Sequence, residues 1–173
     1  MELPTRSDIT SWLAGFGVFF AVGYFLFGWA LSSSPPPQPL RFNHAAHITS
    51  GLTCVDCHAG ARDAVRATLP TIDTCLMCHG EPMTDNPEEE KIRTAAAAGQ
   101  ELSWTQFSRV PPHVYFSHRR HVILGGLECI ECHGPMDTLT EPPRRPFRPI
   151  TMDSCLSCHQ RRKLRNDCND CHR

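Results

Sequence analysis

Every cysteine of this chain belongs to one short pattern. The 173 residues contain ten cysteines and ten histidines, and the cysteines form five copies of C-x-x-C-H with none left over. In this pattern two thiols add to the vinyl groups of one haem, and the following histidine becomes an axial ligand of the iron. We therefore predict five covalently bound haem c groups. The attachment cysteines are Cys54, Cys57, Cys75, Cys78, Cys129, Cys132, Cys155, Cys158, Cys168 and Cys171, and the proximal ligands are His58, His79, His133, His159 and His172.

Other uses of paired cysteines explain this pattern less well. A disulfide framework does not require a histidine after every second cysteine. A zinc site needs four ligands for each metal and no histidine at a fixed following position. A thioredoxin-like C-x-x-C would occur once, between a strand and a helix. Covalent haem is the interpretation that accounts for all five copies.

The remaining histidines equal the predicted haems in number. We predict that they are the distal ligands, so that every iron is bound by two histidines. Six-coordinate iron leaves no open position for a substrate, so no catalytic residue is predicted. The alternative is one His/Met haem of higher potential, which would use Met83, Met136 or Met152 and leave one histidine spare. The predicted distal ligands are His44, His47, His113, His118 and His121.

Four of these five histidines lie in an internal repeat. The segment Phe42–His47 is echoed by Phe116–His121, and each copy leads to G-L-x-C-x-x-C-H and then to a second haem motif. The offset between the copies grows from 74 to 80 residues, which predicts two dihaem modules at about 40–80 and 114–160.

The repeat also suggests which histidine serves which haem. His44 and His118 are expected to serve the haem motif that follows each of them directly. His113 and the motif at Cys168 both lack a counterpart, so we pair them. The haems served by His47 and His121 stay open.

An apolar segment precedes the haem motifs. Ile9 to Leu31 are 23 residues without a charge, long enough for a transmembrane helix, with Trp12 and Trp29 near its ends. A secretory signal peptide is the alternative, but its hydrophobic run is usually shorter. A stripe of mostly small residues predicts packing against another membrane helix. These residues are Ala14, Gly17, Ala21, Tyr24 and Gly28.

The fold class follows from these elements. We expect one N-terminal transmembrane α-helix and a multihaem cytochrome c domain, with short helices and loops around five haems and little or no β-sheet. Asn86 as a cap, Pro87 in the first turn and Gly99 at the end predict one helix between the modules. The predicted organisation is a cytoplasmic N-terminus at 1–8, the transmembrane helix at 9–31, a Pro-rich linker at 32–39, a first dihaem module at 40–80, a helical connector at 81–113 and a second module with three haems at 114–173.

The charges are balanced overall but divided along the chain. With 17 basic and 18 acidic side chains, the composition argues against a nucleic-acid-binding protein. Residues 32–108 carry five basic and nine acidic groups, a net charge of −4, whereas residues 109–173 carry eleven and seven, a net charge of +4. The basic residues either compensate haem propionates or form a docking surface. They cluster at Arg144, Arg145 and Arg148 and at Arg161, Arg162, Lys163 and Arg165.

Two resemblances follow from these motifs. Phe-x-His-x-x-His before C-x-x-C-H resembles the class III multihaem cytochromes, in which the first histidine serves the next haem and the second a later one. The segment Pro111–His121 and the ending Asp170–Arg173, with the anchor and the five motifs, resemble the pentahaem cytochrome c subunit of alternative complex III.

The second resemblance implies a role in a bacterial quinol-oxidising respiratory or photosynthetic complex. Its expected partners are an iron–sulfur subunit, integral-membrane quinol-binding subunits, a monohaem cytochrome c and the lipid membrane. The chain would pass electrons towards a periplasmic acceptor as a subunit, rather than catalyse a reaction itself. The related quinone reductase of sulphate reducers runs in the opposite direction, and that direction stays open.

Haem c is attached outside the cytoplasm, which predicts the topology. The haem domain is expected on the periplasmic side of the inner membrane, with one membrane pass and a cytoplasmic N-terminus. One alternative is a stand-alone membrane-anchored quinol dehydrogenase of a periplasmic reductase system, although that class typically has four haems. A catalytic multihaem reductase often has a C-x-x-C-K motif, and neither Lys91 nor Lys163 follows a C-x-x-C.

Overall fold

A computed structural model describes residues 6–31 and 37–172 of the chain. The chain divides into two compact units, Met1–Pro36 and Pro37–Arg173. Helix α1 (Arg6–Leu31) makes up the described part of the first unit, and all other helices belong to the second. Residues 1–5 of the expected N-terminal segment and residues 32–36 of the expected linker lie outside the described residues.

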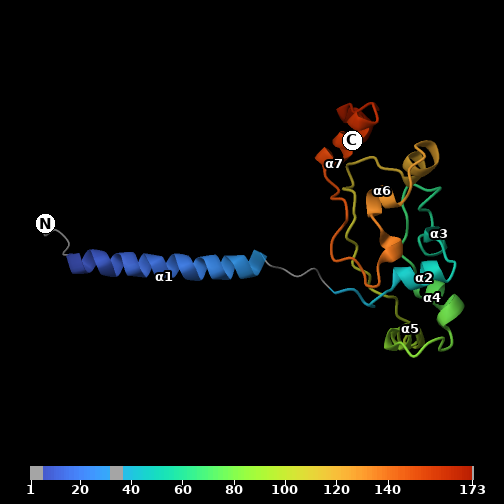
Figure 1. Ribbon diagram of the computed structural model, residues 1–173, viewed down its shortest axis with the longest axis horizontal. Coiled ribbons are helices and arrows are strands. Elements are labelled where there is room, and N and C mark those ends of the chain that lie inside the picture. Colours follow the sequence, from blue (N-terminus) through green and yellow to red (C-terminus); the bar gives the residue numbers. More distant parts are fainter. Residues whose placement is uncertain (1–5, 32–36, 173) are drawn as a thin grey trace. The chain divides into compact units, whose positions relative to one another are not determined.

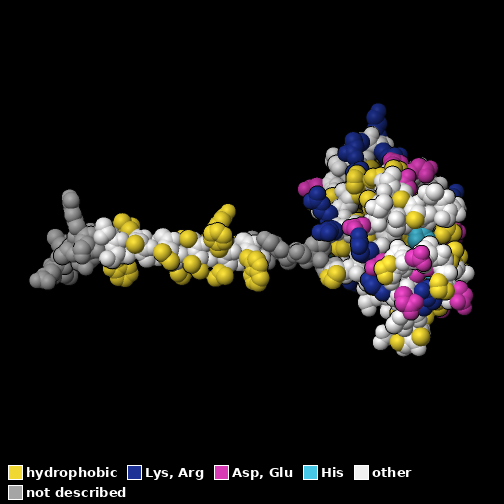
Figure 2. Space-filling view, turned by 60° about the horizontal axis from the view of Figure 1, so that its bottom comes forward, with side chains coloured by type: hydrophobic (Ala, Val, Ile, Leu, Met, Phe, Trp, Pro, Cys, Tyr) yellow, Lys and Arg dark blue, Asp and Glu magenta, His cyan; other side chains and the backbone are white. Residues whose placement is uncertain are grey.

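Helix α1 has the length and composition of a membrane-spanning helix. Its 26 residues extend about 39 Å at ~1.5 Å per residue. The segment Thr10–Trp29 has a mean hydropathy of 1.6, and none of it is buried within the chain. Apolar side chains therefore cover the helix surface, as Figure 2 shows along its visible face. An N-terminal signal sequence would satisfy the same criteria, so the helix is a candidate anchor.

The second unit consists of short helices joined by loops (Figure 1). In residues 37–172 the structure contains no strand, and an isolated antiparallel bridge joins Val114 to His172. The expectation of little or no sheet is confirmed for these residues. The α-helices are α2 (His44–Thr49), α3 (Cys54–Cys57), α4 (Ile72–His79), α5 (Pro87–Ala97), α6 (Ile130–His133), α7 (Met152–Arg161) and α8 (Cys168–Cys171), with a π-helix η1 (Arg120–Leu124) and a 3-10 helix η2 (Met136–Thr138).

Each haem motif lies on one of these short helices, although Cys129, His58 and His172 fall just beyond a helix end. The two cysteines of a motif are three residues apart, so a helical turn places both on the same face. At the start of α3, the Thr53 amide and hydroxyl donate to the Asp56 carboxylate at 2.6 and 2.7 Å. At the start of α7, the Thr151 hydroxyl accepts from the Ser154 amide at 3.2 Å. These caps stabilise motif helices that are too short to persist on their own sequence propensity.

Helix α5 is the helix that the sequence predicts between the modules. The Asn86 side chain caps it by accepting from the Glu88 amide at 3.0 Å. At the other end Gly99 has a φ of +64°, and the Gln100 amide donates to the Ala95 carbonyl at 2.9 Å. This is a Schellman ending, for which glycine is favoured because its backbone is left-handed. The rest of the connector, 81–86 and 98–113, forms turns and extended loop.

The repeat is visible in the backbone, with one local difference. Gly51 and Gly126 occupy equivalent places, and both have positive φ, +92° and +60°. The second copy contains one more residue between its second histidine and this glycine. The π-helix η1 accommodates the extra residue, whereas the equivalent part of the first copy is the end of the α-helix α2. The π-helix is rare in proteins and occurs mostly as single turns of this kind.

The hydrophobic core of the second unit is small and lies at one end. Leu40, Ile72 and Ile92 bury their side chains against one another, and joined to them are half-buried residues that include Trp104. The Trp104 indole donates to the Pro70 carbonyl at 3.0 Å, and α4 packs against α5. This core fixes the position of α4, and with it that of Cys75, Cys78 and His79.

Truncation of a core residue tests this assignment. Ile92 is 7% exposed, so Ile92→Ala is expected to lower the free energy of unfolding by about 2–4 kcal/mol. Urea denaturation of the detergent-solubilised chain measures the change. Ile150→Ala is the control, because Ile150 is 41% exposed and its loss is expected to cost much less. Equal losses for the two variants would contradict the core.

Candidate functional site

The predicted haem ligands gather into five sites in the second unit. We number the sites by their C-x-x-C-H motif in chain order and use these names below. Site 1 is Cys54, Cys57 and His58; site 2 is Cys75, Cys78 and His79; site 3 is Cys129, Cys132 and His133; site 4 is Cys155, Cys158 and His159; site 5 is Cys168, Cys171 and His172.

The two Phe-x-His-x-x-His segments have the same local geometry. Phe42 meets the His44 ring edge-to-face at 4.8 Å and stacks on the His47 ring at 4.4 Å between centroids. Phe116 does the same with His118 at 4.9 Å and His121 at 4.7 Å. In each copy one phenylalanine holds two imidazoles in different orientations. The two histidines of a segment therefore face different neighbours.

Histidines of the haem motifs pair with histidines from outside the motifs. Ring separations are known for four such pairs. The ring centroids of His47 and His79 are 6.0 Å apart, and those of His113 and His172 are 5.8 Å apart. The remaining separations are 6.4 Å for His118–His133 and 6.2 Å for His121–His159. For the fifth pair, His44 lies within electrostatic reach of His58.

These separations fit a metal ion held between two imidazoles. A metal–nitrogen bond of about 2.0 Å on each side, plus the distance from each nitrogen to its ring centre, gives about 6 Å between centroids. The four measured values lie close to this figure. The residues present therefore fit a haem iron with two axial histidines. Among the described residues, no three His, Cys, Asp or Glu side chains converge as a protein-only zinc site requires.

Backbone contacts hold several of these rings in the tautomer that a metal ligand needs. A carbonyl can only accept, so an Nδ1 next to it carries the proton and Nε2 is left free for metal. His47 donates in this way to the Asn43 carbonyl at 2.7 Å, and His121 to the Ser117 carbonyl at 2.8 Å. His58 donates to the Thr68 carbonyl at 3.0 Å.

Burial keeps other imidazoles neutral, which is the form that binds iron. Desolvation lowers the pKa of His44, and the nearby His58 and His47 add to this effect. Desolvation likewise lowers the pKa of His118 and of His133. The Nδ1 of His44 is buried without a hydrogen-bond partner.

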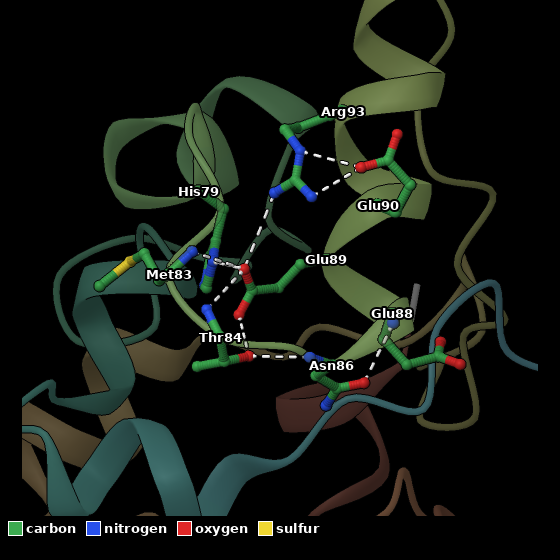
Figure 3. A network of polar contacts seen from close by, with 8 residues as sticks. All are labelled: His79, Met83, Thr84, Asn86, Glu88, Glu89, Glu90 and Arg93. Atoms are coloured by element: carbon green, nitrogen blue, oxygen red, sulfur yellow. Dashed lines mark hydrogen bonds and ion pairs between the residues drawn. The ribbon is translucent and has the colours of Figure 1, made fainter.

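Site 2 is distinguished by a buried acid. Glu89 of α5 is 6% exposed, and its Oε2 lies 3.7 Å from Nδ1 of His79 (Figure 3). Its carboxylate accepts from the Thr84 hydroxyl at 2.5 Å and from the Met83 amide at 2.9 Å. These hydrogen bonds lower the pKa of Glu89 to about 2, so the carboxylate is ionised at neutral pH. The sequence patterns gave Glu89 no part in a haem site.

Contacts between motifs and loops place the sites in a row. Sites 1 and 2 are neighbours because α2 carries both His44 and His47. At the junction of sites 1 and 3 the His118 amide donates to the Val65 carbonyl at 3.1 Å, and the Ala45 amide to the Leu139 carbonyl at 3.0 Å. Burial, and then the adjoining Cys129 thiol, raise the pKa of Cys54.

Sites 3, 4 and 5 continue the row. Arg162 of α7 forms an ion pair of 2.6 Å with Glu131 of α6, so sites 3 and 4 adjoin. Burial and the neighbouring Cys171 thiol raise the pKa of Cys155, which places site 5 beside site 4. The spatial order is therefore 2–1–3–4–5, from α4 beside α5 at one end to α7 and the C-terminal helix at the other (Figure 1).

The basic clusters are partly neutralised within the chain. Arg162 pairs with Glu131, and Arg165 pairs with Asp167 at 2.8 Å. The Arg148 Nε donates to the Glu131 carbonyl at 3.2 Å. Figure 2 shows Lys and Arg side chains gathered over one side of the second unit, with Asp and Glu side chains among them. Local pairing thus accounts for part of this charge, and the docking interpretation remains a prediction.

Comparison with known proteins agrees with the haem interpretation. Residues 114–173 match the family described as cytochrome c7 and related cytochrome c. The chain is also 32% identical over 114 residues to the multiheme cytochrome c subunit of menaquinone reductase from Nitratidesulfovibrio vulgaris (strain Hildenborough). That match covers 62% of this chain and 53% of the relative, so the chain spans about half of the relative's length. The C-terminal region is a cytochrome c7-like multihaem domain, which implies covalently bound c-type haem.

Proposed function

We propose that this chain is a membrane-anchored cytochrome that carries electrons through five bis-histidine haems as a subunit of a quinone-linked membrane complex. One observation carries the proposal: in four of the five sites the motif histidine faces a second histidine across 5.8–6.4 Å. Haem would supply a one-electron couple at each site, and the two facing histidines would hold its iron. Such a site transfers electrons and has no place for a substrate.

The residues of the chain divide this work among them. The ten cysteines would attach the cofactors covalently, and the ten histidines would bind the irons and exclude water from them. The proposed pairs are His44 with site 1, His47 with site 2, His118 with site 3, His121 with site 4 and His113 with site 5. Because the sites adjoin in the order 2–1–3–4–5, the proposed electron path has its ends at sites 2 and 5.

We place the chain in a complex that oxidises quinol, as the resemblance to the pentahaem subunit of alternative complex III implies. The proposed partners are integral-membrane quinol-binding subunits, an iron–sulfur subunit and a monohaem cytochrome c. Helix α1 would anchor the chain in the inner membrane, with the haem domain on the periplasmic side. Electrons would leave towards a periplasmic acceptor.

A second candidate has the same architecture and the opposite direction. The relative from Nitratidesulfovibrio vulgaris is called a menaquinone reductase, which favours delivery of electrons to a quinone. A stand-alone quinol dehydrogenase is the third candidate. The second candidate differs from the first in the direction of electron flow, and the third differs from the first in acting without partner subunits. The proposed ligand set is common to the first two.

The ligand set is tested by removing one distal histidine. The native chain is expected to contain five covalent haems, all of them low-spin. His113→Ala leaves His172 without an opposite ligand, so about one-fifth of the iron is expected to become high-spin. Haem quantification and electron paramagnetic resonance of the oxidised protein measure both quantities.

The controls for this experiment are conservative substitutions of methionine. Met83→Leu, Met136→Leu and Met152→Leu are each expected to leave the spectrum unchanged. A spectral change in one of them would support the His/Met alternative. Entirely low-spin iron in His113→Ala would contradict its pairing with site 5, and four haems in the native chain would contradict the ligand count.

The assembly is tested by purification in mild detergent. We expect an iron–sulfur subunit and polytopic membrane subunits to accompany the chain, and the isolated chain to lack quinol oxidation. Rates of menaquinol oxidation and of menaquinone reduction by the whole complex separate the first two candidates. If the single chain oxidised quinol unaided, the stand-alone dehydrogenase would replace the complex.

A further inference from the structure

The environment of the proximal histidine differs between equivalent sites of the repeat. Site 2 and site 4 are the second haem motifs of their modules. At site 4 the Nδ1 of His159 lies 3.3 Å from the neutral carbonyl of Arg165. At site 2 the Nδ1 of His79 has no hydrogen-bond partner within 3.5 Å and faces the Glu89 carboxylate at 3.7 Å. A histidine beside an anion is a stronger electron donor to its metal than one beside a carbonyl.

The Glu89 carboxylate is held in place by its own contacts. Three hydrogen bonds from Met83 and Thr84 reach it, at 2.9 and 3.3 Å from the two amides and 2.5 Å from the hydroxyl. Its side chain is 8% exposed, so solvent screens its charge poorly. Because Glu89 lies on α5, the small core that packs α5 against α4 also fixes its separation from His79.

A cation next to Glu89 compensates only part of its charge. Arg93 lies 3.7 Å from the Glu89 carboxylate through Nη1, but its Nη2 pairs with Glu90 at 2.7 Å. Figure 3 shows the guanidinium between the two acids, with Glu89 directed at His79 and Glu90 turned away. A second acid near the site, Glu101, accepts from the Ile72 amide at 2.9 Å at the start of α4.

From this arrangement we infer that Glu89 is a positioning residue for His79 and gives site 2 the lowest reduction potential of the five sites. The inference rests on the proposed function, because it requires a haem at site 2. The buried anion favours the oxidised, more positive state of the iron that His79 binds. Site 4, with a neutral carbonyl in the equivalent place, lacks this contribution.

The inference is tested by a substitution that removes the charge of Glu89 and keeps the shape of its side chain. Glu89→Gln retains an oxygen that can accept from Met83 and Thr84. The lowest of the five midpoint potentials is expected to rise by about 59 mV, a tenfold change in the one-electron equilibrium constant, with the other four unchanged. Spectroelectrochemical titration of the full chain in detergent measures all five.

Two further variants make the result specific. Glu90→Gln is the matched control, because this side chain also pairs with Arg93 but is 67% exposed. We expect it to change the one-electron equilibrium constant of site 2 by less than about twofold. Arg93→Gln removes the compensating cation and is expected to lower the same potential. That variant keeps the inference testable even if Glu89→Gln fails to fold.

The outcomes separate this inference from the proposed function. With five haems bound, an unmoved lowest potential in Glu89→Gln would overturn the inference and leave the proposed function intact. An equal shift in Glu90→Gln, or a rise in Arg93→Gln, would overturn it as well. Native protein without covalent haem at site 2 would instead contradict the proposed function.

Discussion

In the second unit, histidine rings face each other in pairs across about 6 Å, and the arrangement of the rest of the unit depends on this constraint. One ring of each pair is placed by the short helix that carries its cysteines, and the other comes from a different part of the chain. Since α2 carries His44 and His47 three residues apart, one helix of six residues must face two motif helices at once. The turn that begins at His118 does the same for sites 3 and 4. Within each copy of the repeat, a shift of either motif helix would separate a pair of rings.

Side-chain packing alone supplies little of what holds these pairs in place. The cluster of Leu40, Ile72 and Ile92 lies at one end, and among residues 37–172 no side chain is below 2% exposure. Ordering a chain of this length costs about 1–2 kcal/mol per residue for the backbone. Under the proposed function, covalent attachment and axial ligation offset much of that cost, because each haem fastens a motif helix to a distant histidine. The core then has a narrower role, which is to fix α4 against α5.

Local sequence determined much of the architecture, and contacts between distant residues determined the rest. The five motifs, the repeat and the ends of α5 could be predicted because each depends on residues within one or two turns. The sites that His47 and His121 face could not be predicted, because these two pairings depend on the path of the loops between the motifs. The one-residue insertion before Gly126 was visible, but its conversion into a π-helix was not anticipated. The contact of Glu89 with His79 was not predicted, because it depends on the turn at 80–86, whose sequence has no hydrophobic periodicity.

The order of the sites and the division of charge have a joint consequence for electron flow. Site 2 lies at one end of the row, in the half with a net charge of −4, and site 5 lies at the other end, in the half with a net charge of +4. A negative surrounding disfavours the reduced state of a haem and a positive one favours it. Under the proposed function, the charges of the side chains would therefore favour transfer from site 2 towards site 5. A quinol-oxidising complex would use this gradient if electrons enter at site 2, whereas a quinone reductase of the same build would deliver its electrons from site 5. Under the proposed function, the direction of electron flow would thus depend on which end of the row contacts the membrane subunits.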